Sequence, residues 1–273
     1  MAFGHRPRGS GTLRCPQILA LQDAPSSPLS FHSPPSYPLL VSNRVIATDS
    51  NLFALPAGLP APSDDGGARH LEGSLVPHVK LKSTAGGVVD VGELAQTLNV
   101  FFLYPATIAP PAVIPGEWSE IPGARGCTVQ NIGFRKLYSA ITKRGCGVFG
   151  VSGQGQTDPD IGLAEQIELR RRLHLPFHLL NDSRFELVQQ LGLPTFVAVL
   201  KDPFVAFEGK LVRFPLQDRR LIRRLTFITD SGRIKKVFYP VFPPDQNAAE
   251  VLEYLEHRAN PAPPGEQSAG GFK

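Results

Sequence analysis

The sequence predicts an α/β fold in which parallel central strands lie beside an antiparallel edge. Two observations support this prediction: apolar runs of strand length alternate with helical patterns, and a hairpin pattern follows near the C-terminal end. Buried parallel strands are continuous apolar runs, whereas a hairpin is marked by a turn between two strand-like segments. The chain has 273 residues, 42% hydrophobic and 19% charged, which suits a folded domain with extensions.

Two predicted strands and the helix between them form the first part of the domain. Val100–Tyr104 is an apolar run suited to a buried central strand, and Gly147–Ser152 is a second such run. Between them a helix is predicted from Cys127 to the basic stop at Lys143–Gly145. The apolar positions of that helix recur at the spacing of one face: Phe134, Leu137, Tyr138 and Ile141.

The next predicted elements continue the alternation of helices and strands. Asp158 is a good N-cap and Pro159 a good first residue for a helix that runs to about Leu173. The elements expected after it are a strand, a short helix and a strand: Phe177–Leu180, Arg184–Leu191 and Thr195–Val199.

The C-terminal part is predicted to contain a hairpin and a last helix. Residues 200–218 are a mixed insertion for which the sequence predicts no shape. The hairpin strands are Leu221–Thr229 and Ile234–Tyr239, joined by an Asp-Ser-Gly turn. Asp245 is expected to cap a helix whose apolar face comprises Ala248, Val251, Leu252 and Leu255.

Both ends of the chain differ in composition from the domain, which we expect to span residues 56–258. Residues 1–55 form a disordered extension rich in proline and serine, and residues 259–273 form a disordered tail. The first 22 residues contain basic residues and no acid, so the extension is either a transit peptide or a plain tail. The expected location is cytoplasmic, or mitochondrial if the extension is a transit peptide.

The composition excludes several classes of function. The formal net charge of +4 is too small to indicate a nucleic-acid partner, and no apolar run is long enough to span a bilayer. Three cysteines (15, 127 and 146) do not make a dense disulfide framework and suggest a reducing compartment. No Cys-x-x-Cys pair exists, and a proline separates His174 from His178, so we expect no metal and no cofactor.

Cys127 is the candidate nucleophile because it stands where a turn-rich segment, Pro122–Gly126, meets a helical pattern. A helix N-terminus favours the thiolate, the form of cysteine that reacts. The flanking glycines and Arg125 predict an exposed thiol in a positive potential. The alternative is a buried, inert cysteine.

The motifs around Cys127 resemble those of the peroxiredoxins, which have the thioredoxin-like fold. The Gly-Cys-Thr-x-Gln motif resembles the bacterioferritin-comigratory, or Q-type, branch, and Trp118–Cys127 resembles a subgroup with a longer loop before the cysteine. The resemblance covers about residues 56 to 257. The matching segments occur in the family's order: Gly126–Gln130, Phe134–Arg135, Val148–Ser152, Leu175–Asp182 and Arg224–Ile228.

The resemblance implies a thioredoxin-like sandwich and a thiol-dependent peroxidase for hydrogen peroxide and organic hydroperoxides. It implies that Cys127 is the peroxidatic nucleophile, which becomes a sulfenic acid. The backbone at Gly126 donates to the peroxide, and Arg224 stabilises the thiolate and polarises the substrate. Pro105 and Thr107 are expected to fold back into the site, as in the long-loop subgroup.

The chain departs from the family pattern at two places. The family has a threonine three residues and a proline seven residues before the cysteine, where this chain has Ala124 and Glu120. Many Q-type members have a second cysteine five residues after the first, where this chain has Ile132. A degenerate redox sensor or interaction module is therefore the alternative function.

The way in which Cys127 is re-reduced is also predicted. Cys146 is expected to be a small apolar strand residue at the far end of the helix, and nothing around Cys15 favours a resolving role. A one-cysteine mechanism follows, with an external thiol, glutathione or a thioredoxin-type protein, as reductant. The protein is expected to be a monomer or homodimer with no nucleic-acid or membrane partner.

Overall fold

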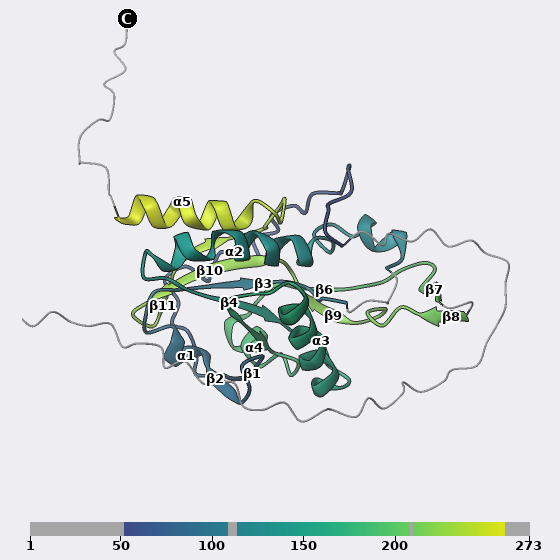
Figure 1. Ribbon diagram of the computed structural model, residues 1–273, viewed down its shortest axis with the longest axis horizontal. Helices are drawn as coiled ribbons and strands as arrows, with labels where there is room; N and C mark the ends of the chain where they lie inside the picture. Colours follow the sequence, from purple (N-terminus) through teal and green to yellow (C-terminus); the bar gives the residue numbers. More distant parts are fainter. Residues whose placement is uncertain (1–51, 109–113, 208–209, 260–273) are drawn as a thin grey trace, which may run out of the picture. The chain divides into compact units, whose positions relative to one another are not determined.

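A seven-stranded mixed sheet forms the centre of the computed structural model, which describes residues 52–108, 114–207 and 210–259 (Figure 1). The three central strands are parallel, and antiparallel pairs flank them on both sides. The predicted α/β class with a mixed central sheet is therefore confirmed. The strand order is β11 (Arg233–Phe238), β10 (Leu225–Asp230), β3 (Asn99–Leu103), β4 (Gly147–Ser152), β5 (His178–Asn181), β1 (Lys80–Ser83) and β2 (Val88–Asp90).

Helices cover both faces of this sheet because the central strand β3 is apolar on both sides. Val100 and Phe102 join the core beneath α2 (Cys127–Thr142), α3 (Pro159–Arg172) and α5 (Asn247–Ala259). Phe101 and Leu103 join the core on the opposite face, with α1 (Val91–Leu94) and α4 (Glu186–Leu191). This alternation is the period of two that a pleated strand imposes on its side chains.

Helix α2 is held on the sheet by aromatic packing and by a neighbouring helix. The rings of Phe102 and Phe134 stack with their centroids 4.2 Å apart. Helix α5 lies beside α2 (Figure 1), and its Ala248, Val251 and Leu255 are buried in the same cluster. The start of α2, where Cys127 lies, is thus fixed to the sheet.

Several predicted boundaries match the structure closely. Strand β4 has the predicted bounds, and Asp158 caps α3 by accepting from the backbone N–H groups of Asp160 and Ile161. The last helix begins at Asn247, two residues after the expected cap Asp245.

The segment between α4 and β10 differs from the prediction. The strand expected at Thr195–Val199 is β6 (Thr195–Val197), and it pairs with β9 (Arg220–Ile222) in a separate two-stranded sheet. The hairpin strand expected at Leu221–Thr229 is divided, because β10 starts only at Leu225. Between the two strands the chain turns Arg224 into the interior, which ends the pairing of β9.

The insertion at residues 200–218 also contains strands. Strand β7 (Phe204–Phe207) pairs antiparallel with β8 (Lys210–Arg213). Apolar residues of this segment, including Leu200, Phe214 and Leu216, pack with Trp118 in a third core cluster. The insertion therefore supports the long loop that precedes Cys127.

No sequence pattern indicated β1, β2 or α1, which together span only Lys80–Leu94. The predicted extension and tail lie outside the described residues, except for residues 52–55 and Ala259, and so does Cys15. Within the described ranges, no helix combines the length and apolarity needed to cross a membrane.

Candidate active site around Cys127

Cys127 is the first residue of α2, and the turn before it requires glycine. Gly126 precedes the helix with φ of 108°, a conformation that residues with a side chain rarely adopt. A Cβ atom on Gly126 would also clash with the ring of Pro244 and lie 3.1 Å from Leu55 Cδ2. The chain can therefore pack tightly at the start of the helix, where the first backbone N–H groups have no partners within the helix.

The prediction that Cys127 is exposed is wrong. Cys127 is 7% exposed and Arg125 is 5% exposed. Both line one pocket, and a Cβ at Gly126 would meet Pro244, so this glycine serves close packing rather than exposure. The remaining lining is mainly apolar: Leu52, Ala54, Ala106, Thr107, Ile108, Ile114, Trp118, Ala124, Gly126 and Thr128.

Arg224 contacts the cysteine directly, although 97 positions separate them in the sequence. Its Nη2 lies 3.2 Å from Cys127 Sγ, and its side chain is 3% exposed. A buried guanidinium that donates to sulfur stabilises negative charge on that sulfur. The structure thus brings together the two residues that the sequence analysis paired.

The same guanidinium also organises the loop before α2. Nη2 lies 3.4 Å from the carbonyl oxygens of Gly123 and Ala124 and 3.2 Å from that of Arg125. Nη1 donates to Gln130 Oε1 at 2.5 Å. These contacts involve residues before and after Cys127 in the sequence, and they fix the position of the Arg224 side chain.

A buried polar chain extends from Gln130 to the sheet, and the sequence analysis did not identify it. Gln130 Nε2 donates to Asn247 Oδ1 at 3.0 Å, and Thr226 Oγ1 donates to the same oxygen at 2.7 Å. All three residues are fully buried. Gln130 lay in the quoted motif, but nothing in the sequence connected Asn247 or Thr226 with it.

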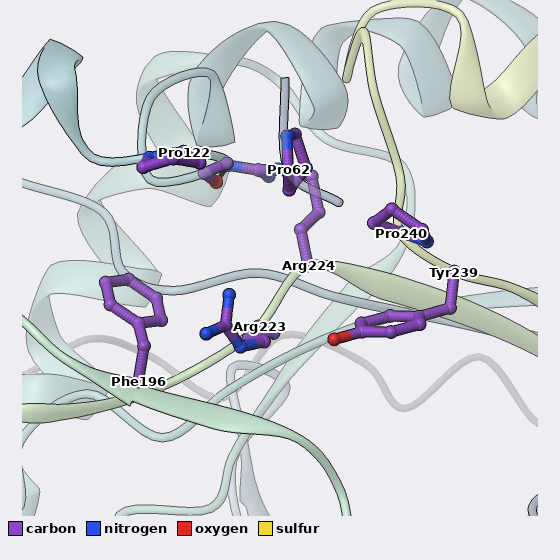
Figure 2. A pocket seen from close by; sticks show the side chains of 8 residues that line it. Pro62, Pro122, Phe196, Arg223, Arg224, Tyr239 and Pro240 are labelled. Atoms are coloured by element: carbon purple, nitrogen blue, oxygen red, sulfur yellow. Dashed lines mark hydrogen bonds between the residues drawn. The ribbon is translucent and has the colours of Figure 1, made fainter. Parts of the chain in front are cut away.

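Arg223 and Arg224 point in different directions (Figure 2), although both lie between β9 and β10 rather than within one strand. Figure 2 shows Arg223 between Phe196 and Tyr239, while Arg224 rises between Pro62 and Pro240. The Arg223 side chain is 35% exposed, and its Nε lies 3.6 Å from Asp65 Oδ2. Its guanidinium carbon lies 5.9 Å from the centroid of the Phe196 ring.

Of the two residues expected to fold back, the structure places Thr107 in the cysteine pocket. Thr107 is 4% exposed and lines the pocket together with Cys127. Pro105 is buried but does not line it, and its carbonyl oxygen accepts from Ser152 Oγ at 3.0 Å.

Gln154 and Glu165 connect Thr107 to helix α3, and the sequence analysis missed both. Gln154 Oε1 accepts from Thr107 N at 2.9 Å and from Thr107 Oγ1 at 3.1 Å. Gln154 Nε2 donates to Glu165 Oε2 at 2.6 Å. Burial raises the pKa of Glu165 to about 7, although the hydrogen bond from Gln154 acts in the opposite direction.

Comparison with known proteins agrees with the motifs. No protein-family model matches the chain. A putative peroxiredoxin, bcp, from Coxiella burnetii (strain RSA 493 / Nine Mile phase I) is 26% identical over 183 residues, which cover 67% of this chain and 97% of that protein. The predicted resemblance to the bacterioferritin-comigratory peroxiredoxins is confirmed.

Solved peroxiredoxins are also similar to the chain. The peroxidoxin BcpB of Mycobacterium tuberculosis is 22% identical, with a TM-score of 0.46 over 68% of this chain and 96% of that chain. A peroxiredoxin Q of Xanthomonas campestris is 20% identical, with a TM-score of 0.47 over 69% and 97% of the two chains.

The second cysteine that the structure describes is not suited to peroxiredoxin chemistry. Cys146 lies beyond the far end of α2, is 1% exposed, and has its pKa raised to about 12 by burial. Cys127 and Cys146 are both free thiols. The described residues contain no cluster of three or more acidic, histidine or cysteine side chains that would hold a metal ion.

Proposed function

We propose that the protein is a thiol-dependent peroxidase that reduces hydrogen peroxide and organic hydroperoxides with Cys127 as the nucleophile. The observation that carries this proposal is the 3.2 Å contact between Arg224 Nη2 and Cys127 Sγ, made at the first residue of a helix and inside a pocket. Positive charge and helix-start N–H groups are what a reactive thiolate requires.

The proposed chemistry is a displacement at oxygen. The Cys127 thiolate attacks the terminal peroxide oxygen, an S–O bond forms, and the O–O bond breaks. The electron pair of that bond leaves with the distal oxygen, which takes a proton and departs as water or an alcohol. Arg224 and the backbone N–H at Gly126 donate to the peroxide oxygens, where negative charge develops.

The pocket lining supports organic hydroperoxides as substrates in addition to hydrogen peroxide. The pocket that contains Cys127 is also lined by large apolar side chains, which can contact an alkyl group: Ile108, Ile114 and Trp118. Hydrogen peroxide has no alkyl group and cannot make these apolar contacts.

The proposed return to the thiol uses an external reductant. One thiol of glutathione, or of a thioredoxin-type protein, displaces water from the Cys127 sulfenic acid, and a second thiol then releases Cys127 as a disulfide forms. The burial of Cys146 supports this one-cysteine route, because a buried neutral thiol is a poor attacking group.

Mass spectrometry of the intact protein after peroxide titration tests this proposal. Stoichiometric peroxide should add one oxygen to Cys127, and Cys127→Ser should abolish both the adduct and peroxide consumption. Cys146→Ser is the matched control and should retain most of the consumption. Normal turnover by Cys127→Ser would contradict the function, whereas a Cys15–Cys127 disulfide would contradict only the one-cysteine route.

A redox sensor is the second candidate, and two observations favour it. Ala124 stands where the family has its threonine, and Ile132 stands where many members have the resolving cysteine. A sensor would be oxidised once and reduced slowly. Steady-state peroxide consumption with excess glutathione or thioredoxin separates the two functions, since a sensor would stop near one equivalent of peroxide per protein.

A further inference from the structure

The side chain of Gln154 makes three hydrogen bonds to a single residue of the cysteine pocket, Thr107. Its Oε1 accepts from the backbone N–H and from the hydroxyl, and its Nε2 donates to the Thr107 carbonyl at 3.3 Å. Gln154 is 2% exposed and Thr107 is 4% exposed. One amide therefore holds both the backbone and the side chain of Thr107 where water does not compete.

The orientation of the Gln154 amide follows from its partners. A backbone N–H can only donate, so the atom that faces Thr107 N must be the amide oxygen. The amide nitrogen then faces Glu165 Oε2, at 2.6 Å, where an ionised carboxylate can only accept. A flipped amide would place its nitrogen against the Thr107 N–H, which cannot accept, and its oxygen against the Thr107 carbonyl and the Glu165 carboxylate, which are acceptors.

This arrangement determines whether the Thr107 hydroxyl can donate or accept a further hydrogen bond. Its one hydrogen is donated to Gln154 Oε1, so the oxygen retains only lone pairs for another group. Thr107 lines the same pocket as Cys127. A hydroperoxide carries its hydrogen on the terminal oxygen, the atom that the sulfur attacks, and that hydrogen needs an acceptor.

We propose that Gln154 is a positioning residue that holds the Thr107 hydroxyl as the acceptor for the O–H of a bound hydroperoxide, with Glu165 fixing the Gln154 amide. This inference rests on the proposed peroxidase function and adds the means by which the substrate is oriented. The hydrogen stays on the attacked oxygen and becomes that of the sulfenic acid. The O–O electron pair leaves with the distal oxygen, which takes its proton from solvent.

The first test compares two reactions of Cys127 in Gln154→Met. The change removes the amide hydrogen bonds at similar length. The rate of oxidation by tert-butyl hydroperoxide should fall about 10- to 100-fold, as expected for a misplaced substrate contact. Alkylation of Cys127 by iodoacetamide, which has no O–H to orient, should change less than about twofold. Trp118, the only tryptophan and a residue of the pocket, supplies a fluorescence signal for oxidation.

A second test exchanges the residues at positions 154 and 165, which keeps the acceptor for the Thr107 N–H and hydroxyl but loses the donation from Gln154 Nε2 to the Thr107 carbonyl. Gln154→Glu should slow peroxide oxidation because two carboxylates then face each other. Adding Glu165→Gln should restore part of the rate, since the new amide donates to the new carboxylate. Gln154→Glu with Glu168→Gln is the matched control, because Glu168 lies on the same helix but pairs with Arg172, and it should not restore the rate.

A third test asks whether Gln154 acts through Thr107. Thr107→Val should slow peroxide oxidation, and adding Gln154→Met should slow it no further. Equal slowing of alkylation and oxidation in Gln154→Met, an unchanged oxidation rate, or failure of the exchanged pair to recover would each overturn the inference. Failure of the unsubstituted protein to react with peroxide would instead overturn the proposed function.

Discussion

Arg224 joins Cys127 to Gln130, with Nη2 at 3.2 Å from the sulfur and Nη1 at 2.5 Å from the glutamine Oε1. Positions 127 and 130 lie one turn apart on α2, so a single guanidinium contacts two residues of the same helical face. The geometry uses the planar fork of arginine, which the single ammonium of lysine cannot reproduce.

We therefore expect Arg224→Lys to lower the second-order rate of peroxide reduction by about 10²- to 10³-fold, the usual cost of losing one donor to a charged transition state. Arg223→Lys is the matched control, because Arg223 lies one position away and contacts Asp65 instead. Stopped-flow measurement of Cys127 oxidation decides the question. Equal losses in the two variants would show that the Arg224 contact with sulfur is unimportant.

Gly126 and Gly145 differ in the space that a side chain at each position would have. Both have positive φ, but a Cβ at Gly145 meets no atom within 4 Å, whereas one at Gly126 clashes with Pro244. Gly145→Ala should lower the free energy of unfolding by about 1 kcal/mol from backbone strain alone. Gly126→Ala should cost about 1–3 kcal/mol more because packing must also shift. Urea denaturation of both variants measures the difference, and equal losses would contradict it.

The predictable parts of the fold were those marked by local pattern. Strand β4 and the Asp158 cap of α3 carry their signals within a few residues, so the sequence located them well. The pairing of β6 with β9 could not be predicted, because an apolar run does not specify which sheet it joins.

The site was predictable only where motifs marked it. Cys127 and Arg224 lie in quoted motifs, whereas Gln154 and Glu165 are isolated polar residues without a periodic signal. Their partners are fixed by tertiary packing alone, since Gln154 is 47 positions from Thr107. The burial of Cys127 was missed for the same reason, because segments distant in the sequence, such as those of Leu52 and Thr107, line its pocket.

Cys146 should be unreactive in the folded protein. Its thiol is 1% exposed and its pKa is raised to about 12 by burial, so almost none of it is thiolate near neutral pH. In a variant with Cys15→Ser and Cys127→Ser, iodoacetamide at pH 8 should label Cys146 only after denaturation. Rapid labelling of the native variant would contradict this expectation.

Glu165 should make stability fall as the pH rises through neutrality. Its pKa is raised from 4.5 to about 7 in the folded state, chiefly by burial, so folding favours the protonated carboxyl. Its contribution is fully present below pH 4.5, declines above that value, and is lost as the pH passes through about 7. The loss should not exceed about 3.5 kcal/mol, at about 1.4 kcal/mol for each pKa unit.

Urea denaturation between pH 4.5 and 8 measures this effect in the unsubstituted protein and in Glu165→Gln. The glutamine variant cannot ionise, yet its oxygen can still accept from Gln154, so its free energy of unfolding should fall less over this range. Asp182 titrates in part of the same range, because burial raises its pKa to about 6, and it is present in both proteins. The difference between the two curves therefore isolates Glu165, and parallel curves would show that folding does not perturb its ionisation.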